Sequence, residues 1–250
     1  MLTLLPMPSI APPITPPPIS GRGAPSSWRR TARAEALRTR LRETAARLYA
    51  RDGIDGVTIA DIARAAQIPP GSATHAYPRR RDLLFDIVHA HIDALHEYVG
   101  RADDAFAEAA PQRRLEAIAM ALLDAVFDHR HAQRVLTLAE PLLSDDQRDL
   151  LRFQLRTLHD RIATVVADAL PHLGAHRAFQ APLAHMLMAM ATDAPAWFRD
   201  DGALSRRDYA RLMVRGIVNG GDAMLVAEAI DDAAAITSDP ASTPPPAQDP

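Results

Sequence analysis

The sequence predicts an all-α protein of about nine helices, with a three-helix head at the N-terminus and a larger helical-bundle body. Through most of the chain, apolar residues recur at spacings of three and four, which is the period of a helix face. Alternating β-branched runs of strand length are missing. Prolines and glycines divide the pattern into segments of helical length, so we expect each segment to form one helix.

The composition excludes several classes of protein. The chain has 250 residues, of which 48% are apolar and 24% are charged, as in soluble globular proteins. It contains no cysteine, which excludes disulfide frameworks, thiolate zinc sites and cysteine nucleophiles. The apolar N-terminus lacks the basic start of a signal peptide, and no stretch has the length of a membrane helix. We therefore expect a soluble, cytoplasmic protein with no membrane partner.

Composition also divides the chain into domains. Residues 1–27 contain eight prolines and the tail 231–250 is similar, so we expect both to be disordered extensions. Between them, the head is expected over residues 28–79 and the body over residues 80–230. From residue 28 to 82, 12 arginines stand against 6 acidic residues, although the whole chain has a net charge of −3. This distribution is typical of a region that binds a polyanion, but a solvated arginine-rich helix face gives the same count.

The head begins with a helix predicted over residues 32–51, which Gly53 ends by adopting the left-handed conformation. The apolar face of this helix is formed by Leu37, Leu41, Ala45, Leu48 and Tyr49. A second helix follows Thr58, an N-cap residue whose capping-box partner is Asp61, three positions later.

The second helix is short and leads into a third. Val57 and Ile62 are placed to form a hydrophobic staple around its cap. The helix breaks at residues 67–70, and Pro70 suits the first turn of a third short helix over residues 71–77.

The body begins with a long helix predicted over residues 80–99. Its expected core positions are Leu83, Leu84, Ile87, Val88, Ile92 and Leu95. Further helices are predicted at residues 112–129, 131–140, 145–170, 180–198 and 206–229. The residues that separate them are Pro111, Pro141, Pro171 and Gly202.

The two short helices of the head cannot bury enough surface alone and need the first helix beneath them. This is a helix-turn-helix arrangement, in which the second helix of the pair lies in the major groove of duplex DNA. Ser72, Thr74 and His75 are placed to reach outward from that helix, whose N-terminal amides favour phosphate. The arginines at 79–81 follow at the start of the long helix, where the DNA backbone would run.

Over residues 38–84 the sequence resembles the TetR family of bacterial regulators in the order and spacing of its motifs. These motifs are Leu48-Tyr49 before Asp52-Gly53, the capped stretch Thr58-Ile59-Ala60-Asp61-Ile62-Ala63, and Gly71, Tyr77 and Arg80. Residues 186–221 look like the last two, dimer-forming helices of the family. The resemblance implies a ligand-responsive repressor that binds a palindromic operator as a homodimer, with Arg80 on a DNA phosphate.

The residues predicted to bind DNA are Thr58, Ser72, Thr74, His75, Arg79 and Arg80. The chain departs from the family pattern in three places. Gln67 stands where the family has glycine, which costs about 1 kcal/mol in a left-handed conformation. Pro69 and Pro70 replace a serine and a basic residue, while Thr74 and Ala76 replace aromatic residues. The alternative is therefore a helical ligand-binding or interaction protein whose DNA-binding head is weakened or lost.

We expect a partly apolar small molecule to bind within the body. The candidate positions are His91, Leu95, Leu122, Phe127, Leu155, His159 and Met186. One apolar helix carries Met186, Met188, Met190, Trp197 and Phe198. We interpret this stretch as core and dimer interface, with a ligand cavity as the alternative, because methionine adapts to varied ligands.

The sequence offers no support for a metal site or an active site. The pairs His89/His91 and His129/His131 are two residues apart, so on a helix they point to opposite sides, and His172 and His176 bracket a glycine-containing loop. The acidic residues that show no paired arrangement with a nucleophile are Asp124, Asp128, Asp160 and Asp193. We therefore expect no metal, no cofactor and no enzymatic activity. The expected partners are duplex DNA, a second copy of the chain and an unidentified ligand.

Overall fold

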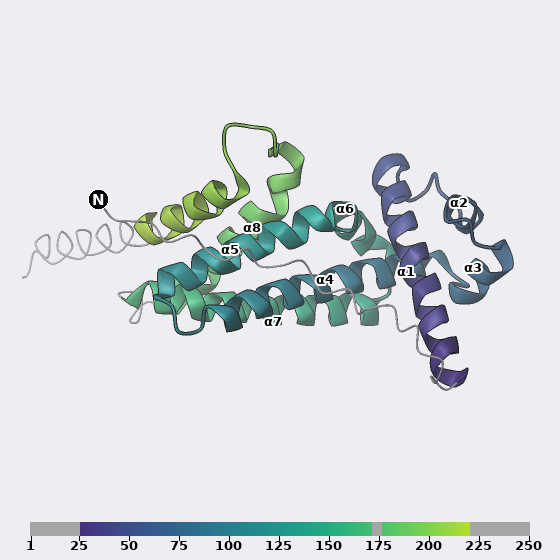
Figure 1. Ribbon diagram of the computed structural model, residues 1–250, viewed down its shortest axis with the longest axis horizontal. Coiled ribbons are helices and arrows are strands. Elements are labelled where there is room, and N and C mark those ends of the chain that lie inside the picture. The colour runs from purple at the N-terminus through teal and green to yellow at the C-terminus, as the bar shows by residue number, and fades with distance from the viewer. Residues whose placement is uncertain (1–25, 172–176, 221–250) are drawn as a thin grey trace, which may run out of the picture.

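The computed structural model describes residues 26–171 and 177–220, and in these ranges the regular structure is helical (Figure 1). Several predictions lie outside the described residues: the disordered ends up to residue 25 and from residue 231, the helix end at 221–229, and His172 and His176. The predicted extension 1–27 and the described part of the chain overlap at Ser26 and Ser27, where the first helix already begins.

The head consists of α1 (Ser26–Asp52), α2 (Ile59–Ala65) and α3 (Pro70–Ala76). Figure 1 shows α1 running across one end of the body, with α2 and α3 on its far side. α1 begins before the predicted start at residue 32; residues 31–36 are all exposed, so this part has no buried face that a pattern could reveal. The buried core of the head includes Leu41, Ala45, Tyr49, Ile62, Ala63, Ala73 and Tyr77.

The body begins with α4 (Arg80–Ala105), which is longer than the predicted helix over residues 80–99. Gly100 does not end the helix, because the next turn is anchored: Ala102 and Asp103 are both buried. The other helices agree with the predicted segments to within about one residue. They are α5 (Pro111–Asp128), α6 (Arg130–Ala139), α7 (Asp145–Ala169) and α8 (Gln180–Trp197). A last helix begins at residue 206, as predicted, and is described to residue 220; short 3-10 helices lie at Glu140–Leu142 and Arg177–Phe179.

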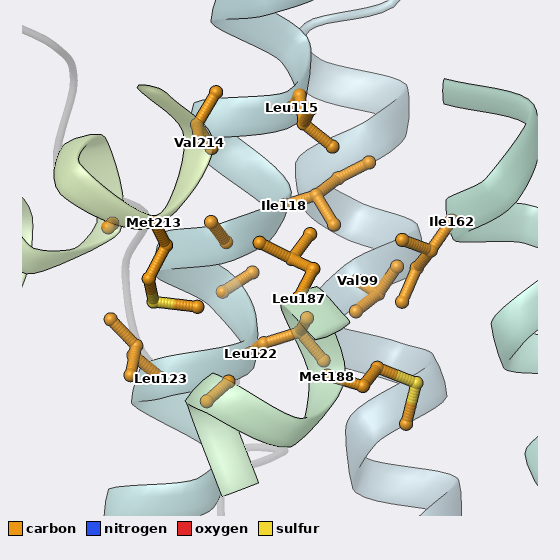
Figure 2. Close-up of a cluster of buried hydrophobic side chains, with 14 of the residues drawn as sticks. Val99, Leu115, Ile118, Leu122, Leu123, Ile162, Leu187, Met188, Met213 and Val214 are labelled. Atoms are coloured by element: carbon orange, nitrogen blue, oxygen red, sulfur yellow. The ribbon is translucent and has the colours of Figure 1, made fainter. Parts of the chain in front are cut away.

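Two hydrophobic clusters divide the described structure, and α4 contributes to both of them. Its first half, from Leu83 to Ile92, packs with the head and with α6, while its second half, from Leu95 to Ala102, packs in the body. Figure 2 shows how α4, α5, α7, α8 and the last helix interleave their side chains in the body cluster. The labelled residues are Val99, Leu115, Ile118, Leu122, Leu123, Ile162, Leu187, Met188, Met213 and Val214. A displacement of α4 would therefore change the packing of both the head and the body.

Candidate nucleic-acid interface

The start of α2 carries the predicted capping box. The Asp61 backbone N–H donates to Thr58 Oγ1 over 3.2 Å, and the Thr58 backbone N–H donates to Asp61 Oδ2 over 3.1 Å. The hydrogen bonds from Thr58 hold the pKa of Asp61 below its ordinary value. Val57 and Ile62 are both buried around this cap, as the staple prediction required. The cap therefore fixes the N-terminus of α2, where Thr58 is exposed to solvent.

The turn between α2 and α3 contains the predicted strained residue. Gln67 has a φ of 55°, in the left-handed region. The Ile68 backbone N–H donates to the Ala63 carbonyl oxygen over 2.9 Å and closes the turn. Arg40 of α1 donates to Gln67 Oε1 over 3.2 Å, a contact that the sequence pattern did not reveal. The turn thus adopts the left-handed conformation without glycine, and α1 supports it directly.

α3 presents its polar side chains because its apolar ones are anchored. Ala73 and Tyr77 are buried, whereas Ser72, Thr74 and His75 are all exposed, as expected. Pro70 occupies the first turn, where its missing N–H is not needed. The short α3 therefore offers a hydroxyl and imidazole surface to a partner.

Tyr77 holds the end of α3 against the first and fourth helices. Its hydroxyl donates to Asp86 Oδ2, and Arg42 of α1 pairs with the same carboxylate over 3.3 Å. The Arg38 guanidinium lies 5.2 Å from the centre of the Tyr77 ring. Burial and the hydrogen bond to Asp86 raise the pKa of Tyr77 above its ordinary value, so its hydroxyl keeps its proton at neutral pH. Residues far apart in the sequence make this network, and sequence reasoning missed it.

The predicted phosphate-binding arginines have partners within the chain. Arg79 pairs with Asp82 over 2.9 Å, and its side chain is largely exposed. Arg80 donates to the Ile54 carbonyl oxygen over 3.0 Å and lies 3.3 Å from Asp55 Oδ1. Arg80 therefore joins the start of α4 to the loop between α1 and α2. Any contact with DNA phosphate must share or replace these hydrogen bonds.

The predicted ligand-binding residues are divided between the core and the surface of the body. Leu95 and Leu122 are fully buried core residues, and Phe127 packs edge-on against Phe198. Leu155 is half-buried, and its carbonyl oxygen lies 2.9 Å from His159 Nδ1. Met186 faces outward and is 51% exposed, because the inward face of α8 is formed by Leu183, Ala184, Leu187 and Met188. The sequence pattern showed that α8 is apolar, but not which side of it faces the core.

A cavity of about 420 Å³ lies instead where the head meets the body, between α1, α4 and α6. The residues that line it are Thr39, Arg42, Glu43, Ala46, Arg47, Ile87, Ala90, His91, Asp128, His129, His131 and Ala132. Of the predicted ligand-binding set, it includes only His91.

In ranges 26–171 and 177–220, no three side chains of His, Asp or Glu are grouped so as to hold a metal ion. None of the described helices combines the length and the hydropathy that crossing a membrane requires.

Comparison with known family models assigns both parts of the chain. Residues 41–87 match the model described as bacterial regulatory proteins, tetR family. Residues 108–220 match the model described as tetracyclin repressor-like, C-terminal domain. The first match covers the helix-turn-helix geometry described above, and the second covers most of the body.

Individual proteins show the same likeness. The chain is 31% identical over 99 residues to the HTH-type transcriptional repressor KstR2 of Mycobacterium tuberculosis, a match over 40% of this chain and 48% of the repressor. The chain thus spans about half the length of the curated relatives it matches.

Solved structures share the fold over most of their length. A TetR-family transcriptional regulator from Bordetella parapertussis has a TM-score of 0.66 at 24% identity, over 74% of this chain and 95% of that one. AibR, in complex with isovaleryl coenzyme A and operator DNA, has a TM-score of 0.59 at 23% identity, over 74% and 98% of the two chains. Identities at this level show a common fold.

Proposed function

The chain belongs to the TetR family of bacterial regulatory proteins, and from this membership we propose that it is a ligand-responsive transcriptional repressor. It binds a palindromic operator in duplex DNA as a homodimer, and a small molecule releases it. The matched models and relatives describe transcriptional regulators rather than enzymes, which supports this class of function.

The observation that carries the proposal is the surface of α3. Because Ala73 and Tyr77 anchor the helix, Ser72, Thr74 and His75 project from its exposed side. A short helix with outward hydroxyl and imidazole groups can enter a major groove and form hydrogen bonds with base edges. The exposed Arg79 stands at the next helix start, where a phosphate contact would position the head.

The homodimer is proposed to form through α8 and the last helix. Met186 and Trp197 of α8 are 51% and 53% exposed, and Leu212 of the last helix is 57% exposed. Large apolar side chains left in solvent on the two helices that the family uses for dimerisation support this surface as the contact. Two-fold symmetry then places two heads on two half-sites of a palindrome.

One observation favours the second candidate, a helical ligand-binding protein with a weakened head. α3 carries no arginine or lysine, and the Arg80 guanidinium is already bonded to the loop between α1 and α2. Affinity for DNA would then depend on few phosphate contacts. Each phosphate contact steepens the dependence of the binding constant on salt by about one unit.

Selection of duplexes from a random library by the purified full chain tests the proposal. We expect palindromes with half-site centres about one helical turn, or ~10 base pairs, apart. Binding of a selected duplex should fall steeply as salt rises. Thr74→Ala should weaken it, and the matched control Thr164→Ala, on an exposed position of α7, should not. No enrichment of any sequence, together with salt-independent binding, would favour the second candidate.

A further inference from the structure

The cavity between head and body lies between α1 on one side and α4 and α6 on the other. α1 supplies one wall through Ala46, and α4 and α6 supply the other through Ile87 and Ala132. At its mouth, Glu43 and Arg47 carry opposite charges and are both exposed. Arg42, Asp128, His129 and His131 complete the polar part of the lining, and the Arg42 side chain, which pairs with Asp86, is only 20% exposed. The apolar wall therefore comes from the alanine and isoleucine side chains. A volume of about 420 Å³ falls in the range of sites that hold small organic molecules.

His91 adds a polar group to this apolar wall. Its side chain is 1% exposed, and its Nε2 lies 2.7 Å from Gln133 Oε1. Because an amide oxygen accepts, Nε2 carries the ring proton and Nδ1 carries a lone pair. Burial lowers the pKa of His91 to about 4, so the ring is neutral at pH 7. Nδ1 is thus a buried hydrogen-bond acceptor, and it has no partner among the described residues.

A buried acceptor without a partner is unfavourable, so such atoms usually meet a ligand or water. A neutral acceptor selects a ligand that donates a hydrogen bond and gives no advantage to an anion. The surrounding alanine and isoleucine side chains select an apolar ligand body. A small alcohol or phenol has both properties: a hydroxyl that donates a hydrogen bond and an apolar body.

We propose that this junction cavity is an effector site for a small neutral alcohol or phenol whose hydroxyl donates to His91 Nδ1. The apolar part of the ligand lies between α1 on one side and α4 and α6 on the other. The site shares only His91 with the set predicted among the body helices, of which Leu95, Leu122 and Phe127 lie in the body core.

The position of the site explains how a bound ligand can change the affinity of the head for DNA. This step rests on the proposed repressor function. α1 is the base of the head, and it packs on α4 and α6 of the body. A ligand seated between these helices opposes any head orientation that closes the cavity. If the DNA-bound orientation closes it, the ligand and DNA exclude each other, with a coupling set by the difference in ligand affinity between the two orientations.

The test uses the full chain labelled with ¹⁵N at histidine, with 2-naphthol as the probe and 2-methoxynaphthalene as the matched compound that cannot donate. We expect 2-naphthol to shift the His91 Nδ1 resonance and the methyl ether to leave it unmoved. The double variant His91→Phe, Gln133→Leu removes both polar partners together and should weaken 2-naphthol binding about tenfold or more. His96→Phe, on the same helix outside the cavity, should bind like the parent.

A second variant covers the case in which the double variant fails to fold. Ala132→Leu, at a half-buried position on the cavity wall, fills the site and should weaken binding to a similar degree. Three outcomes would overturn the site. They are equal affinity for both compounds, an unmoved Nδ1 resonance at the solubility limit of 2-naphthol, and undiminished 2-naphthol binding in the folded cavity variants. The unmoved resonance would mean that water alone occupies the cavity.

Affinity for a selected duplex is measured on the same preparations, which separates the two proposals. We expect 2-naphthol to weaken DNA binding by the parent and to have no effect on the cavity variants. Binding of the probe with unchanged DNA affinity would refute the effector role. Failure of the ligand-free chain to bind any duplex would refute the repressor function. The ligand site is judged separately, by the shift of the His91 Nδ1 resonance.

Discussion

The hydroxyl of Tyr77, at the end of α3, donates a hydrogen bond to the carboxylate of Asp86 on α4. Arg42 of α1 binds the same carboxylate, so three helices meet at one acidic group. The outward face of α3 depends on this junction, because Tyr77 is the last anchored residue of the helix.

Tyr77→Phe keeps the ring and removes the donor. We expect the free energy of unfolding to fall by about 1 kcal/mol, because Asp86 keeps Arg42 as a partner but loses one partly buried hydrogen bond. Urea unfolding at neutral pH measures the change. Tyr77→Ala, which also leaves a cavity, should cost about 3 kcal/mol or more. An unchanged midpoint in the phenylalanine variant would show that the hydroxyl contributes nothing.

Thr58→Ala removes the side chain that caps α2. The expected loss is about 1 kcal/mol of unfolding free energy, and Thr58→Ser should keep most of the stability because serine caps equally well. Thermal unfolding of the three chains gives the ranking. If alanine and serine variants melt together, the capping box makes no contribution to the head.

Acid should destabilise the chain through His91. Its folded pKa of about 4 lies below the unfolded value of 6.5, so between these pH values the unfolded chain binds more protons and stability falls as pH falls. The full effect of this group is roughly 3 kcal/mol and is complete below the folded pKa. Unfolding at pH 7 and pH 5 should show a smaller difference in the His91→Phe, Gln133→Leu variant than in the parent. Identical differences would contradict the assignment.

Asp103 joins three helices of the body. It accepts from Arg114 Nε over 2.6 Å and from Arg161 Nε over 2.8 Å, and its side chain is 8% exposed. Burial alone raises the pKa of Asp103, but the two guanidinium hydrogen bonds outweigh it and hold the pKa below its ordinary value. The charged form is therefore favoured in the folded state, and this stability is lost as pH falls through the lowered pKa.

We expect Asp103→Ala to lower the free energy of unfolding by about 2 kcal/mol, less than a fully buried pair because both arginines are partly exposed. The matched control is Asp104→Ala, whose carboxylate is 82% exposed and lies 3.4 Å from Arg161. Its loss should be within ~0.5 kcal/mol of zero. Comparable losses at the two positions would contradict the structural role of Asp103.

Met186→Glu should weaken the proposed homodimer, because it places a charge in the centre of an apolar contact. Sedimentation of the parent and the variant over a range of concentrations measures the change. Phe153→Glu is the control: Phe153 is 60% exposed on α7, outside the proposed contact, and this variant should associate like the parent. A parent that stays monomeric, or equal effects of the two substitutions, would count against this surface.

Apart from the start of α1, the helices of the head could be predicted closely from the sequence, because their signals are local. Gly53 takes the left-handed conformation, Thr58 caps α2, and Gln67 is left-handed at the position where the pattern called for glycine. Each of these features depends on residues within one or two helical turns. The DNA contacts themselves remain predictions, since exposure of Ser72 and His75 is a condition for binding and not a measurement of it.

Which way the predicted ligand-binding residues face could not be predicted from the sequence, for the opposite reason. Helical periodicity shows that a face is apolar, but the rotation of each helix is set by packing against partners far away in the sequence. Met186 faces solvent because its neighbours fill the core, and His91 meets Gln133 across 42 positions of the chain. Local patterns therefore specified the helices, most of their ends and the family. Long-range packing specified which side chains face one another, the partner of Arg80, and the cavity between head and body.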